Sequence, residues 1–101
     1  MIKVLIKREE KRFISLEVKG HANSAEYGKD LVCAAVSSVL TGGFNNLENP
    51  KSFELKLEEG YAYAKAIKEV SSHDEVVMET IITGLKTIEE SNPQFITIKN
   101  F

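Results

Sequence analysis

Two stretches of alternating apolar and polar residues lie near the N-terminus, at residues 2–7 and 14–18. A two-residue period is typical of a half-buried strand. The charged residues 9–11 between the stretches predict a turn, and Gly20 predicts the end of the second strand. We therefore expect an N-terminal hairpin. Its inward positions are Ile2, Val4 and Ile6 in the first strand and Ile14, Leu16 and Val18 in the second.

From Asp30 the apolar spacing changes to three and four residues and continues to Leu47, which predicts a helix. Asp30 stands before the first apolar residue, where it is a natural N-cap. Gly42 and Gly43 either weaken the later part of this helix or permit close packing, and Asn49-Pro50 ends it. The apolar positions are Leu31, Val32, Ala35, Val36, Val39, Leu40, Phe44 and Leu47.

The second half of the chain repeats this order of patterns. Residues 53–57 and 61–67 alternate on either side of a Glu-Glu-Gly turn, which predicts a second hairpin. Ser72 and Glu75 have the spacing of a capping box, and a helix of roughly 73–91 follows, with Val76, Val77, Ile81, Leu85 and Ile88 as its apolar positions. Asn92-Pro93 ends that helix, and "QFITIK" reads as a last strand.

The expected order is ββαββαβ, without the regular strand and helix alternation of a parallel sheet. We therefore predict an α+β fold in which an antiparallel or mixed sheet of about five strands carries two helices on one side. We expect residues 1–101 to form a single domain. A domain of this size buries a modest share of its surface, so association with a second copy is an expected source of stability.

Composition narrows the classes of function. With 43% hydrophobic and 28% charged residues the chain is typical of a globular protein, and its net charge of −2 argues against a general nucleic-acid binder. One cysteine allows no internal disulfide, and any metal site would need His21, His73 and carboxylates without a Cys pair, so we expect neither zinc nor another cofactor. No apolar run is long enough to span a bilayer. We expect a reducing cytoplasm and no membrane partner.

Cys33 and His21 are the residues with the strongest chemical potential. If Asp30 is the N-cap, Cys33 lies in the first helical turn, where unpaired N–H groups and the helix dipole favour a thiolate. The Gly-containing loop 20–29 is long enough to bring His21 beside the helix start, and an imidazole there would complete a nucleophilic pair. The alternative is structural: a small buried cysteine and an exposed loop histidine.

Three further residues have supporting roles beside more ordinary ones. Asp30 is a helix cap that would also orient His21. Ser37 follows Cys33 by one turn on the same face, either near the site or as a small packed residue. Gly28 either lets the chain approach a substrate or merely permits a positive φ in the loop.

The stretch "GHANSAEYGKDLVCAAVSSVL" resembles the signature of the ribosomal-processing cysteine protease family, Prp. That signature has a histidine in Gly-His-Ala and a cysteine in Gly-x-Asp, two aliphatic residues, then Cys-Ala. The chain length and the ending "LKTIEESNPQFITIKN" are also similar to this family. The resemblance implies a catalytic dyad of His21 and Cys33, with Asp30 at the acidic position and Gly28 in a loop that closes over the peptide.

By the same resemblance, the substrate is the N-terminal extension of a large-subunit ribosomal protein, cleaved after an aromatic pair, and the enzyme is a homodimer. Residues and resemblance agree on one mechanism, in which the Cys33 thiolate attacks a peptide carbonyl and His21 protonates the leaving amine. Backbone N–H groups at the helix start would bind the oxyanion. The alternatives are a noncatalytic ribosome-associated or assembly factor with a structural cysteine, and a thiol redox sensor, which would lack a resolving cysteine.

Overall fold

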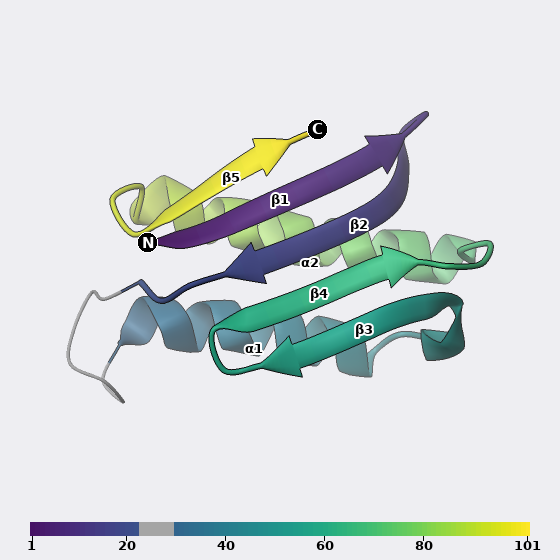
Figure 1. The fold of residues 1–101 in the computed structure, drawn as a ribbon, viewed down its shortest axis with the longest axis horizontal. Helices are drawn as coiled ribbons and strands as arrows, with labels where there is room; N and C mark the ends of the chain where they lie inside the picture. Colours follow the sequence, from purple (N-terminus) through teal and green to yellow (C-terminus); the bar gives the residue numbers. More distant parts are fainter. Residues whose placement is uncertain (23–29) are drawn as a thin grey trace.

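The elements of the computed structural model, which describes residues 1–22 and 30–101, follow the order ββαββαβ (Figure 1). The predicted α+β class and element order are confirmed. The strands are β1 (Ile2–Glu9), β2 (Arg12–Lys19), β3 (Phe53–Glu58), β4 (Tyr61–Ala66) and β5 (Ile96–Asn100). The helices are α1 (Leu31–Asn45), α2 (Ser72–Ser91) and the short 3₁₀ segment η1 (Pro50–Ser52).

The five strands form one mixed sheet in the order β3-β4-β2-β1-β5. β1 is parallel to β5, and the other three neighbouring pairs are antiparallel. Figure 1 shows α1 and α2 on the same side of this sheet. The inward side chains of the strands pack against the helices there, and Val4, Met78 and Leu85 at the centre of this core are 0% exposed.

A register shift between Lys7 and Arg8 corrects the predicted inward face of β2. Ser15 pairs with Lys7 and Phe13 pairs with Arg8, so Ile14 has no partner in the ladder. A bulge of this kind inserts one residue and reverses the faces beyond it. Phe13 therefore occupies the core at 1% exposure, whereas Ile14 is only half-buried.

Close packing of α1 against α2 depends on glycine. A Cβ on Gly43 would overlap the side chain of Ile81, and a Cβ on Gly84 would lie 3.0 Å from Val39 Cγ1. The expectation that this part of α1 permits close packing is therefore confirmed for Gly43, whereas Gly42 has open space around it.

Two predicted helix ends are confirmed, the start of α1 at Asp30 and the end of α2 at Ser91, and the other two differ. Asp30 is the N-cap of α1, as predicted, but α1 ends at Asn45 rather than near Leu47. The N-cap of α2 is Ser71 rather than Ser72, and its hydroxyl accepts from Asp74 N at 3.2 Å. The predicted capping box is wrong because the Glu75 carboxylate instead accepts from the backbone of β2, at Phe13 N.

Two predicted apolar positions of the helices point outward. Leu31, at the start of α1, is 80% exposed, and Val76, near the start of α2, is 65% exposed. Met78 and Ile82, which the predicted spacing left out, are buried in the core instead. Among the described helices, none is both long and apolar enough to cross a membrane.

Candidate active site

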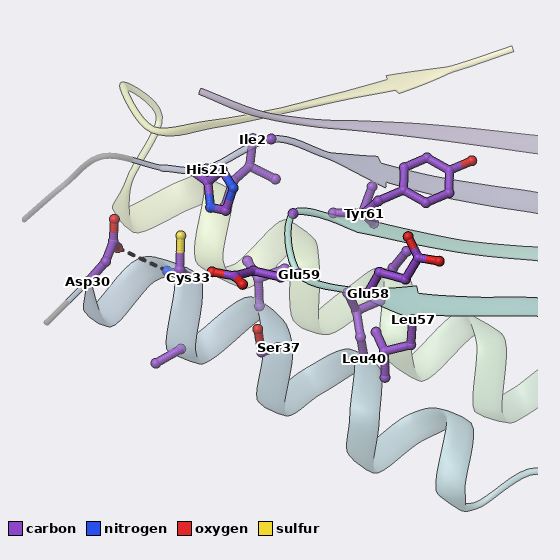
Figure 2. Close-up of a pocket in the computed structure, with 16 residues that line it drawn as sticks. Ile2, His21, Asp30, Cys33, Ser37, Leu40, Leu57, Glu58, Glu59 and Tyr61 are labelled. Atoms are coloured by element: carbon purple, nitrogen blue, oxygen red, sulfur yellow. Dashed lines mark hydrogen bonds between the residues drawn. The ribbon is translucent and has the colours of Figure 1, made fainter. Parts of the chain in front are cut away.

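A pocket of about 560 Å³ lies between the first turns of α1, the end of β2 and the turn that joins β3 to β4 (Figure 2). His21 and Cys33 both line it, so the structure brings together the two residues that the sequence singled out. In Figure 2 the imidazole and the thiol come from different walls and face the same space. The floor is apolar and is formed by Ile2, Val18, Val36, Leu40, Leu57 and Ala62.

Cys33 occupies the third helical position of α1 and is half-buried rather than enclosed in the core. Its sulfur accepts a hydrogen bond from Ala22 N at 3.3 Å. The backbone at the end of β2 therefore reaches the thiol directly. A polar donor aimed at the sulfur, together with the adjoining pocket, distinguishes Cys33 from a cysteine that only fills core space.

Asp30 accepts hydrogen bonds from two backbone N–H groups in the first turn of α1, those of Cys33 and Ala34. Its carboxylate accepts from Cys33 N at 3.0 Å, and its carbonyl oxygen accepts from Ala34 N at 3.0 Å. The cap role predicted for Asp30 is confirmed, and Asp30 also lines the pocket. Since both N–H groups already have acceptors, they are not open donors for a substrate oxygen in this conformation.

His21 lies two residues after the end of β2 and is exposed. Its carbonyl oxygen accepts from the amino group of Met1 at 2.8 Å, and the preceding Gly20 N donates to Gly60 O at 2.9 Å. These bonds fix the backbone on both sides of the histidine. The side chain thus stands on a segment held by β1 and by the β3–β4 turn.

The structure places one of the two remaining predicted residues. Ser37 lines the same pocket, one helical turn after Cys33. Gly28 lies outside the residues that the structure describes.

The β3–β4 turn supplies pocket residues that the sequence did not single out. Glu58, Glu59, Gly60 and Tyr61 line the pocket, although they are distant from Cys33 in the chain. In the sequence, "EEG" carried only the signal of a turn. Its place beside His21 depends on the pairing of β4 with β2, which no local pattern specifies.

Acidic side chains set the charge of the pocket rim. Among the described residues that line the pocket, acidic side chains occur at three positions and lysine or arginine at none. The Tyr61 hydroxyl donates to Glu17 Oε2 at 2.8 Å, and this hydrogen bond, with burial as a smaller cause, raises the pKa of Tyr61. Tyr61 therefore stays protonated at neutral pH, and its hydroxyl donates to Glu17, which does not line the pocket.

A second cluster of possible ligand atoms lies away from the pocket, where Glu48, His73 and Asp74 have one ligand atom each within 4.8 Å of one another. The Asp74 carboxylate accepts from Glu48 N at 2.8 Å and Asn49 N at 2.9 Å, and His73 Nδ1 lies 2.9 Å from it. These bonds account for Asp74 as a structural acceptor that holds the loop before η1.

Comparisons with known proteins agree with the geometry. The family described as Cysteine protease Prp matches residues 1–97. The ribosomal processing cysteine protease Prp of Bacillus subtilis is 37% identical over 98 residues, covering 88% of each chain. That of Mycoplasma genitalium is 35% identical over 83 residues, covering 82% of this chain and 84% of the relative.

Solved structures give the same result. The crystal structure of the essential ribosomal processing protease Prp from Staphylococcus aureus with a covalently linked product peptide matches with a TM-score of 0.90 at 26% identity, covering 100% of both chains. The structure of that protease with a substrate peptide matches with a TM-score of 0.83 at 25% identity, again covering 100% of both chains.

Proposed function

The chain belongs to the cysteine protease Prp family, and on this premise we propose that Cys33 and His21 are its catalytic dyad. The observation that carries the assignment is their shared pocket, in which Cys33 has a backbone donor on its sulfur and His21 faces it from another element. A thiol and an imidazole in one cleft are the groups that covalent peptide hydrolysis requires.

In the proposed reaction the Cys33 thiolate attacks the scissile carbonyl carbon and forms a tetrahedral oxyanion. Collapse of this intermediate breaks the C–N bond, and the His21 imidazolium gives its proton to the leaving amine. Water then attacks the acyl carbon while His21 takes one water proton. Breakage of the C–S bond releases the carboxylic acid and restores the thiolate and the imidazolium.

We assign the oxyanion donor to Ala22 N–H rather than to the helix start. The N–H groups of Cys33 and Ala34 are bound to Asp30, whereas Ala22 N lies 3.3 Å from the attacking sulfur. Once the sulfur bonds to carbon, the oxyanion lies next to it, and this donor can change its acceptor from sulfur to oxygen. Backbone donors placed in this way stabilise developing charge without a further side chain.

The proposed substrate is the N-terminal extension of a large-subunit ribosomal protein, cleaved after an aromatic pair. Two observations support it: relatives at up to 37% identity are ribosomal processing proteases, and the S. aureus protein binds peptides. The apolar floor formed by Val36, Leu40 and Leu57 suits a large apolar side chain beside the scissile bond.

We further propose that the enzyme works as a homodimer in the cytoplasm, without direct contact to nucleic acid or membrane. Its small size favours association with a second copy as a source of stability. The net charge of −2 and the lone cysteine fit a protein of the reducing cytoplasm that does not bind phosphate backbones.

The test is cleavage of a synthetic peptide that copies the extension, followed by mass spectrometry. We expect the wild-type protein and Ser38→Ala, an exposed change on α1 outside the pocket, to cut one bond. We expect Cys33→Ala and His21→Ala to cut none. Undiminished cleavage by either dyad variant would disprove the assignment, and a folded wild type that cuts nothing would favour the noncatalytic binding protein.

A further inference from the structure

The β3–β4 turn touches the imidazole of His21 at Gly60. A Cβ built on Gly60 would lie 2.7 Å from His21 Nε2, 3.2 Å from Cε1 and 3.5 Å from Cδ2. Real Cβ atoms do not approach a ring atom at the first of these distances. The imidazole therefore lies in the space that any side chain at position 60 would occupy.

Gly60 is also tied to the segment that carries His21. Its carbonyl oxygen accepts from Gly20 N at 2.9 Å, so the turn is bonded to the residue that follows β2. The turn has little freedom of its own because β4 pairs with β2 along its length, from Tyr61 opposite Lys19 to Lys65 opposite Ser15. One face of the His21 site is consequently a backbone surface held in place by the sheet.

This contact also determines which edge of the ring faces the pocket. The three atoms nearest the Gly60 position are Nε2, Cε1 and Cδ2, so the Nε2 edge faces the turn and Nδ1 lies on the opposite edge. In Figure 2 the His21 ring stands between the turn that leads into Tyr61 and the wall that carries Cys33. The Nδ1 edge is therefore the one left for the thiol.

We propose that Gly60 is a positioning residue for His21: the absent side chain lets the Nε2 edge rest on the turn and directs Nδ1 toward Cys33. The inference rests on the proposed dyad and adds a residue that acts on the reaction through His21. A side chain at position 60 displaces the imidazole from the pocket. A displacement of about 1 Å costs a catalytic pair on the order of a hundredfold in rate.

The first test compares Gly60→Ala and Gly60→Asn with Gly42→Ala, whose added Cβ meets nothing within 4 Å. Because Gly60 has a φ of +74°, alanine adds backbone strain to the contact, whereas asparagine tolerates this region better and keeps the contact. We expect both Gly60 variants to lose kcat about a hundredfold with KM changed less than about threefold, and Gly42→Ala to match the wild type.

An Asn variant within about threefold of the wild-type kcat would overturn the proposal, since strain alone would then explain the alanine result. A loss of kcat that equals the unfolded fraction of each variant, measured by circular dichroism, would also overturn the proposal.

The second test uses the wild-type protein and needs no catalysis. His21 and His73 are the two histidines, so their ring protons are readily assigned by NMR, with His73 as the internal reference. We expect nuclear Overhauser contacts from the His21 ring protons to the Gly60 α-protons, and their absence would overturn the inference even if the variants fail to fold. If the wild type cleaves no peptide, the proposed function fails, whereas these contacts still decide whether Gly60 positions His21.

Discussion

Replacing Asp74 by asparagine tests how a fully buried charge stabilises this fold. Asp74 is 0% exposed and is the one buried charged side chain in the described part of the chain. Its carboxylate accepts from both Glu48 N and Asn49 N, but an amide has a single acceptor oxygen. One backbone donor is left facing an NH₂ group, which costs about 1–3 kcal/mol, and the loss of charge assistance adds about 1 kcal/mol.

We therefore expect Asp74→Asn to lower the free energy of unfolding by about 2–4 kcal/mol at neutral pH. For a domain of this size, that corresponds to a fall in Tm of roughly 10 °C or more. The assay is urea unfolding followed by circular dichroism, with Glu90→Gln, an exposed change on the same helix, as the control. A difference below about 1 kcal/mol at pH 7 would refute the reasoning.

The same variant makes a prediction about pH. Burial by itself raises the pKa of Asp74, but hydrogen bonds from Glu48 N, His73 and Asn49 N outweigh it and hold the pKa below its usual range. A carboxyl whose folded pKa is lowered stabilises the fold above its unfolded pKa of about 3.9 and loses that contribution as the pH falls through the folded value. The gap between wild type and Asp74→Asn should therefore narrow below about pH 4, and a constant gap would contradict this account.

Three further predictions concern the helix contact and the pocket. Gly43→Ala should lower the free energy of unfolding by about 1–3 kcal/mol through overpacking, whereas Gly42→Ala should raise it by about 0.5–1 kcal/mol, both measured by urea unfolding. Iodoacetamide should modify Cys33 in the native protein at neutral pH, about tenfold more slowly in His21→Ala, as followed by mass spectrometry; an inert Cys33 would contradict its activation. Leu57→Asp should raise KM for the apolar peptide about tenfold or more with the fold intact, and an unchanged KM would remove Leu57 from the binding surface.

Local patterns predicted most of the fold because the elements here bury one face each. In the described part of the chain the two-residue and helical periods located the five strands and both α-helices, but not the 3₁₀ segment η1, and the Asp30 cap followed from chemistry confined to one turn. The errors concern residues whose position depends on a segment distant in the sequence. Ile14 does not face the core because the pairing of β1 with β2 shifts register there. Glu75 does not cap its own helix because its carboxylate accepts a hydrogen bond from the backbone of β2.

The residues of the candidate site differ in the same way in how far the sequence predicts them. His21 and Cys33 were visible in the sequence because a motif places them a short loop apart, and the structure puts them in one pocket. Gly60 was not visible, since its contact with the imidazole arises only after β4 pairs with β2. A glycine after two glutamates has the same local pattern whether it closes an exposed hairpin or supports a histidine.

The occupied donors at the start of α1 change what the helix contributes to the proposed reaction. Asp30 holds the N–H groups of Cys33 and Ala34, so these two groups are not open donors for a substrate oxygen. The proposed oxyanion donor is Ala22 N–H, next to His21 in the segment that follows β2. Imidazole and oxyanion donor therefore share one segment, held by Met1 and by the Gly60 turn, so whatever displaces that segment impairs both at once.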